Sequence, residues 1–129
     1  MQARMPAVPG EPRMRFLFIV RTGPYAFQHL HTVHALARAA LAKGHEVGMF
    51  LTEDAVVAMN ANCRTGSETN LTEVLVELAG QGVQVQGCGA CCQFRGQKRG
   101  DIAEGLRIAG IAALGKMVSE ADRVISFGY

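Results

Sequence analysis

A strand, a helix and a second strand follow one another early in this chain, and that order constrains the fold more than any other feature. Arg15–Val20 and Glu46–Leu51 are short apolar runs, typical of strands that are buried on both faces. Between them, apolar side chains recur at helical spacing over about residues 27–43, and Gly44 follows as a stop signal. Two strands joined through a helix are expected to pair in parallel, because a parallel pair needs a long crossover.

The same alternation continues to the end of the chain. A short helix is expected over residues 54–60, capped at Thr52 or Asp54, and a longer one over residues 71–79, capped by Asn70. The remaining expected elements are strands at 83–87 and 106–109, a helix at 111–120 and a strand at 123–127. This order predicts one doubly wound α/β domain with a mostly parallel five-stranded sheet, helices on both faces, and reactive loops at the carboxyl ends of the strands.

The first residues differ in composition from the rest. Residues 1–13 show no apolar periodicity and hold three of the four prolines, Pro6, Pro9 and Pro12. We expect residues 1–13 to be an extended or disordered leader, with residues 14–129 forming the folded domain.

Composition and motifs exclude several classes of function. A chain of 129 residues with 49% hydrophobic residues suits one globular domain, and a net charge of +2 is too small to predict binding to nucleic acid or to an anionic membrane. No apolar run approaches the roughly 20 residues of a membrane helix, and no secretory signal is visible, so we expect a cytoplasmic protein. Neither G-x-G-x-x-G after the first strand nor G-x-x-x-x-G-K-[ST] occurs, so no nucleotide cofactor is expected.

Three of the four cysteines, Cys88, Cys91 and Cys92, fall within five residues. They follow the strand expected at 83–87, where a helix is about to begin, so their thiols are placed at the reactive edge of the sheet. The thiolate is the reactive form of cysteine, and a nearby arginine such as Arg95 lowers the pKa of a thiol. We therefore expect sulfur chemistry, with Cys88 as a nucleophile of depressed pKa.

The surroundings of Cys88 leave alternatives open. Gly87 and Gly89 flank it without side chains, which favours access for a partner. Cys88 and Cys91 form a C-x-x-C pair, so they could exchange thiol for disulfide, or Cys91 could resolve a Cys88 persulfide by releasing sulfide. A metal site needs about four ligands, and because no second C-x-x-C or H-x-x-x-H pair is present, no metal is expected. Cys92 is expected to pack.

Several short motifs together resemble the DsrE/DsrF/TusD-like family of sulfur-relay proteins, over about residues 14–127. The motifs are Thr22-Gly23-Pro24-Tyr25 with Gln28, Gly44-His45-Glu46, Cys88 followed by Arg95-Gly96, and the closing Ala121-Asp122-Arg123-Val124-Ile125-Ser126-Phe127. The resemblance implies a flavodoxin-like three-layer domain that forms trimers or hexamers, or assembles with related subunits. It also implies a cysteine that carries sulfur as a persulfide from a donor protein to an acceptor protein.

Position by position, Cys88 matches the sulfur-carrying cysteine of that family, and Cys91 falls where some members have a second cysteine. Tyr25 and Gln28 lie in the loop after the first strand, which is expected to open on the same edge as Cys88, so they are candidates to line a sulfur pocket. The expected function is a sulfurtransferase that carries a persulfide on Cys88. The alternatives are a thiol-disulfide redox protein that uses Cys88 and Cys91, and a non-catalytic interaction subunit.

Overall fold

The computed structural model describes residues 12–129, so residues 1–11, most of the expected leader, lie outside the described residues. The chain is anchored just before its first strand. Arg13 Nε–H donates a hydrogen bond to the Gly44 carbonyl over 2.8 Å, and the Met14 N–H donates to His45 Nδ1 over 3.1 Å. The turn at Gly44 and His45 therefore holds the segment that leads into the domain.

Five strands form one sheet in which all neighbouring pairs are parallel. Their spatial order is β4-β3-β2-β1-β5, so β4 and β5 are the edges. The strands are β1 (Arg15–Val20), β2 (Glu46–Leu51), β3 (Gln84–Cys88), β4 (Arg107–Ala109) and β5 (Arg123–Phe127). The helices are α1 (His29–Ala42), the 3₁₀ helix η1 (Glu53–Met59), α2 (Leu71–Gly80), α3 (Gly89–Phe94), the 3₁₀ turn η2 (Arg99–Asp101) and α4 (Ile111–Glu120). The fold predicted from the alternation of elements is confirmed.

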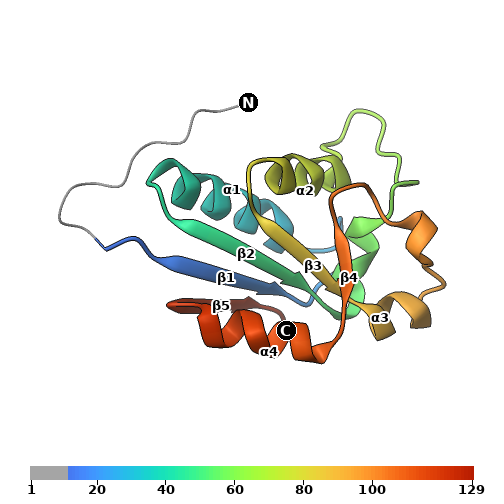
Figure 1. Cartoon of the computed structure of the whole chain (residues 1–129). Helices are drawn as coiled ribbons and strands as arrows, with labels where there is room; N and C mark the ends of the chain where they lie inside the picture. Colours follow the sequence, from blue (N-terminus) through green and yellow to red (C-terminus); the bar gives the residue numbers. More distant parts are fainter. Residues whose placement is uncertain (1–11) are drawn as a thin grey trace.

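Helices cover both faces of the sheet and give three layers, with α1 and α2 on one face and α4 on the other (Figure 1). Side chains along β1 alternate between these layers, as expected for a strand buried on both faces. Phe18 and Val20 belong to the larger core beneath α1 and α2. Leu17 packs on the opposite face with Phe50 of β2 and Met117 of α4.

Two of the predicted helix signals act as expected, and a third does not. Gly44 follows α1 with a φ of 84°, a left-handed conformation that glycine adopts without strain. Asn70 Oδ1 accepts a hydrogen bond from the Glu73 N–H over 3.1 Å at the start of α2. For the short helix, Thr52 occupies the N-cap position of η1 as predicted, but its side chain makes no capping hydrogen bond, and the alternative cap, Asp54, lies inside the helix.

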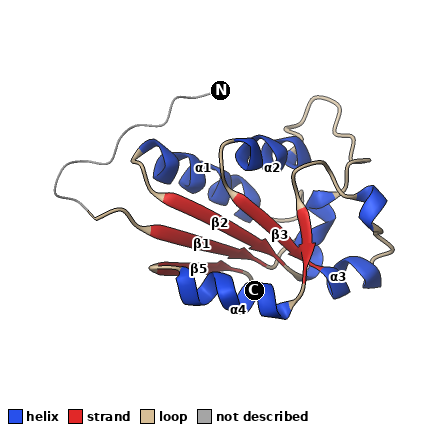
Figure 2. Cartoon of the chain, viewed as in Figure 1, coloured by secondary structure: helices blue, strands red, loops and turns tan. Residues whose placement is uncertain are grey.

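The carboxyl ends of β2 and β3 lead into two short helical segments that pack against each other. β2 runs into η1 and β3 runs into α3, and Figure 2 shows η1 and α3 together beyond that end of the strands. This junction brings two parts of the chain together that are far apart in sequence. No helix formed by residues 12–129 has both the length and the apolar character that crossing a membrane requires.

Candidate functional site

Cys88 and Cys91 form a hydrogen-bonded pair of thiols at this junction. Cys88 ends β3 and caps α3, and its Sγ accepts a hydrogen bond from the Cys91 N–H over 3.3 Å. Cys91 Sγ in turn accepts a hydrogen bond from the Glu53 N–H over 3.2 Å and lies 3.5 Å from Thr52 Oγ1. Both cysteines are free and half-buried. The two sulfur atoms are therefore held between the end of β3 and the segment that follows β2.

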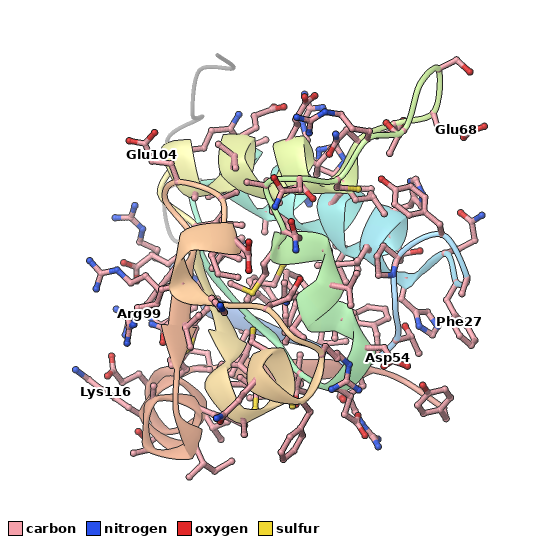
Figure 3. The ribbon with its side chains drawn as sticks, turned by 90° about the vertical axis from the view of Figure 1, so that its right-hand side faces the viewer. Phe27, Asp54, Glu68, Arg99, Glu104 and Lys116 are labelled. Atoms are coloured by element: carbon pink, nitrogen blue, oxygen red, sulfur yellow. The ribbon has the colours of Figure 1, made fainter. Side chains whose placement is uncertain are left out.

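Arg95 places a positive charge beside Cys91 and is itself held in position. Its Nη1–H donates to the Cys91 carbonyl over 3.0 Å. Its Nε–H and Nη2–H donate to Asp54 Oδ1 over 3.0 and 2.7 Å. Figure 3 shows Asp54 at the end of η1 that lies beside α3. The ion pair thus links η1 to the end of α3 and fixes the guanidinium near the thiols.

The contacts of Cys91 favour its thiolate. Partial burial acts to raise the pKa of the Cys91 thiol, but hydrogen bonds from the Cys88 side chain, Thr52 and the Glu53 N–H, together with the charge of Arg95, outweigh it and lower the pKa from its ordinary value. These groups come from two segments of the chain, the start of η1 and the two ends of α3. Cys91 is therefore the thiol that ionises first.

The expectation that Cys88 has a depressed pKa is contradicted. Burial raises the pKa of Cys88, and the hydrogen bond and negative charge of Cys91 raise it further, although the N–H groups of Cys91 and Ala90 act in the opposite direction. Arg95, predicted to support Cys88, instead acts on Cys91. In this pair the pKa of Cys91 is lowered and that of Cys88 is raised, so the thiolate forms more readily on Cys91.

Cys92 packs in the core, as expected. It is 1% exposed and belongs to the core beneath α1 and α2. The buried Gln97 amide lies 3.6 Å from its Sγ and also donates a hydrogen bond to the Val56 carbonyl over 3.0 Å. Among residues 12–129, no three His, Cys, Asp or Glu side chains are grouped closely enough to hold a metal ion.

The two glycines beside Cys88 lie close to side chains of neighbouring elements. A Cβ at Gly87 would overlap Met59 Sδ, inside the core. A Cβ at Gly89 would meet Ile108 Cγ2 at 3.0 Å, a tight contact that would require a small shift of the Ile108 side chain. These contacts account for a glycine at each position, and access of a partner to the half-buried Cys88 stays a prediction.

Tyr25 and Gln28 lie away from the thiol pair. Tyr25 Oη donates a hydrogen bond to the Thr69 carbonyl over 3.0 Å and accepts one from the Leu71 N–H over 2.9 Å, so it braces the start of α2. Tyr25 and Gln28 line a pocket of about 390 Å³ together with Glu68. No cysteine lines this pocket, so the structure does not bring these two residues to the candidate sulfur site.

The segment that follows β2 contributes three site residues that the sequence interpretation did not assign to the thiols: Thr52, Glu53 and Asp54. Their position directly after a predicted parallel strand was a usable signal, because such strands end at the same edge of the sheet. Glu53 also has a φ of 53°, which is uncommon for a residue with a side chain. This strained residue supplies the N–H that reaches Cys91, and its carboxylate accepts a hydrogen bond from Arg21 Nε–H over 2.6 Å.

The pH dependence of alkylation is expected to show the charge of Cys91. Because the thiolate is the reactive form, the midpoint for Cys91 should lie below that of an ordinary thiol, near 8.5, and below that of Cys88. Arg95→Ala removes the nearby positive charge and leaves the Asp54 carboxylate unpaired, so it should raise the midpoint. Lys98→Ala, which removes a charge that does not act on Cys91, is the matched control. Peptide mapping after iodoacetamide pulses at a series of pH values measures each cysteine separately, and an unshifted Cys91 in Arg95→Ala would contradict the assignment.

Known proteins match this chain over nearly all of its described residues. The model of the DsrE/DsrF-like family matches residues 14–127. The uncharacterized protein MJ0989 of Methanocaldococcus jannaschii is 32% identical over 114 residues, which are 88% of this chain and 100% of that protein. A protein named sulfurtransferase TusD, from Erwinia tasmaniensis, is 30% identical over 129 aligned positions, covering 88% of this chain and 100% of the relative.

Among solved structures, the YchN protein of Escherichia coli has a similar fold. Its crystal structure matches with a TM-score of 0.78 over 88% of this chain and 99% of that chain, at 24% sequence identity. The α/β domain with its parallel sheet is therefore shared with a protein of known structure.

Proposed function

The chain belongs to the DsrE/DsrF-like family, and we propose that it is a sulfur carrier, which accepts sulfur as a persulfide on Cys88 and passes it to a partner protein. Relatives that carry the name sulfurtransferase support a role in sulfur transfer. The observation that carries the proposal is the Cys88–Cys91 pair, in which one thiol is hydrogen-bonded to a second thiol of lowered pKa. Cys88 is assigned as the carrier because, by the resemblance of motifs described above, it corresponds to the sulfur-carrying cysteine of the family.

The pair supplies a base for the loading step. The hydrogen bond between the side chains raises the pKa of Cys88 and lowers that of Cys91, the pattern expected when the Cys88 S–H donates to a Cys91 thiolate. As Cys88 Sγ attacks the outer sulfur of a donor persulfide, its proton passes to Cys91. A sulfur–sulfur bond forms on Cys88, the donor's sulfur–sulfur bond breaks, and the donor cysteine leaves as a thiolate.

When the sulfur is delivered to an acceptor, Cys88 is the leaving group rather than the nucleophile. A thiolate of the acceptor attacks the outer sulfur of the Cys88 persulfide, and Cys88 leaves as a thiolate. The Cys91 N–H, 3.3 Å from Cys88 Sγ, stabilises that leaving charge. The same backbone group is in place before and after the reaction, so it needs no rearrangement when charge develops.

We also propose that the carrier works as an oligomer in the cytoplasm. It would be a homotrimer or homohexamer, or an assembly with related subunits, and would exchange sulfur with donor and acceptor proteins rather than with nucleic acid or a membrane. The edge strand β5 supports an assembly, because it leaves Val124 and Ile125 exposed by 43% and 39%. The four free cysteines agree with a reducing compartment.

Loading is tested with the wild-type protein and a small persulfide donor. The reaction is quenched with iodoacetamide within seconds and analysed by intact mass and by peptide mapping. We expect a gain of about 32 Da, the mass of one sulfur atom, located on Cys88 and removed by reductant. Donor-derived sulfur that arrives first on a cysteine other than Cys88, or an absence of sulfur on Cys88 at every time point without formation of a Cys88–Cys91 disulfide, would contradict the proposal.

A second candidate function is thiol-disulfide exchange by the same C-x-x-C pair, which the proximity of the two thiols favours. This function predicts a Cys88–Cys91 disulfide under mild oxidation without a sulfur donor, and no mass gain of about 32 Da with one. A non-catalytic interaction subunit would show neither product.

A further inference from the structure

Cys91 has a position that the carrier function alone does not require. Its sulfur is fixed beside Cys88 by hydrogen bonds from the Glu53 N–H and Thr52, so it stays there when Cys88 is loaded. Cys88 directly precedes the first turn of α3, and Cys91 lies in that turn, three residues later, where side chains three apart are neighbours. A loaded Cys88 therefore faces a second nucleophile inside its own chain.

We propose that Cys91 discharges the Cys88 persulfide as sulfide when no acceptor takes the sulfur; this inference rests on the proposed function. The Cys91 thiolate attacks Cys88 Sγ, the inner sulfur of the persulfide. A Cys88–Cys91 disulfide forms, the bond between Cys88 Sγ and the outer sulfur breaks, and the outer sulfur leaves as HS⁻ with the proton that it held in the persulfide. The Cys91 sulfur is oxidised and the outer sulfur is reduced, so the step needs no external oxidant.

The electrostatics of the site favour this attack. After loading, Cys91 holds the proton it took from Cys88, and it must lose that proton before it can react. The hydrogen bonds from Thr52 and Glu53 and the charge of Arg95 lower the pKa of Cys91, so they favour the return of Cys91 to the thiolate that attacks Cys88. An ion pair with Asp54 holds the Arg95 guanidinium in this position.

The other two cysteines are unsuited to the role. Cys92 is 1% exposed in the core, and burial raises the pKa of its thiol. Cys63 belongs to the loop before α2, where its carbonyl accepts hydrogen bonds from Arg64 and Asn70. Cys91 combines a thiol of lowered pKa with a position beside Cys88.

With this discharge step, the sulfur on Cys88 has two possible fates: transfer to an acceptor or release as sulfide. A docked acceptor thiol and Cys91 compete for the same persulfide: the acceptor attacks the outer sulfur and Cys91 the inner one. Discharge leaves a disulfide, so further turnover needs an external dithiol reductant, which opens the bond and becomes a disulfide itself. The reaction class is reduction of persulfide sulfur to sulfide by a dithiol.

The experiment follows persulfide, disulfide and sulfide in one reaction. Wild-type, Cys91→Ser and Cys63→Ser proteins are loaded with glutathione persulfide, freed of excess donor and sampled over time. Intact mass reports the gain of about 32 Da and the later loss of about 2 Da relative to the reduced protein, and monobromobimane traps sulfide. Cys63→Ser is the matched control because it removes a thiol outside the pair.

We expect wild-type and Cys63→Ser proteins to release about one sulfide per loaded chain while the Cys88–Cys91 disulfide appears. Cys91→Ser should load more slowly, because it lacks the base, but should keep its persulfide at least about ten-fold longer and release little sulfide. Equal persulfide lifetimes in wild-type and Cys91→Ser proteins would overturn the inference and leave the carrier function intact. Movement of the sulfur from Cys88 to Cys91 as a persulfide would also overturn the inference and leave the carrier function intact. If Cys88 gains no sulfur in any of the three proteins, the proposed function itself fails.

Discussion

Cys88→Ser protein is expected to lose sulfur transfer from a persulfide donor to an acceptor thiol by at least about 100-fold, because an alcohol at this position does not form a persulfide. Cys91 is not expected to replace Cys88. Its sulfur is held beside Cys88 by the Glu53 N–H and Thr52, which suits attack within the chain. Towards an external donor, a thiolate stabilised by these groups and by Arg95 is a weaker nucleophile than its charge suggests. The variant should therefore keep its fold and its Cys91 thiol but carry no sulfur.

Transfer is measured as donor-derived ³⁵S on a small acceptor thiol, with Cys63→Ser as the matched control. Cys63 lies before α2, outside the thiol pair, so Cys63→Ser should transfer at the wild-type rate. Circular dichroism and thermal unfolding show whether Cys88→Ser is folded. Wild-type transfer by folded Cys88→Ser protein, or donor sulfur on its Cys91 at the wild-type rate, would move the carrier role to Cys91.

Gly87→Ala is expected to destabilise the domain by about 1–3 kcal/mol, the usual cost of overpacking a dense core, and to lower the unfolding temperature by roughly 4–12 °C. The added Cβ would overlap Met59 Sδ, and Met59 is fully buried, so its side chain has little space to move. The effect should reach the site as well, because residue 87 directly precedes Cys88 at the end of β3.

A double-mutant cycle with Met59→Ala separates this clash from other effects of alanine in a strand. In the Met59→Ala background the cost of Gly87→Ala should fall close to zero, because the overlapping atom is gone. Gly115→Ala is the control: Gly115 is exposed within α4 and a Cβ there would meet nothing within 4 Å. Gly115→Ala should stabilise the domain by about 0.5–1 kcal/mol, because alanine loses less backbone entropy than glycine when the helix forms. Equal costs of Gly87→Ala in the two backgrounds would show that packing against Met59 is not the cause.

Local patterns in the sequence were sufficient for most of the fold. The β-branched run at Arg15–Val20, the helical spacing before Gly44 and the cap at Asn70 each depend on residues close together in the chain, so each could be read without tertiary information. Parallel pairing followed from the length of the crossovers, and the sheet is parallel throughout. The placement of three cysteines at the carboxyl edge followed because parallel strands all end at the same edge of the sheet.

The pKa shifts of Cys88 and Cys91 could not be derived from such local patterns. Glu53 and Cys91 are 38 residues apart, and Asp54 and Arg95 are 41 apart, so no local pattern relates them. The sequence suggested that Arg95 would make Cys88 the acidic thiol, whereas the contacts lower the pKa of Cys91 and raise that of Cys88. Likewise no local pattern showed that Gly87 lies against Met59 and Gly89 against Ile108, which are distant in sequence.

The order of amino acids was thus enough to establish a parallel α/β domain with cysteines at its reactive edge, because periodicity and turn residues act between neighbours in the chain. Which cysteine carries the charge depends on the folded structure. The pKa of a thiol depends on the donors, charges and solvent within a few ångströms of the sulfur, and here the packing of η1 against α3 supplies them.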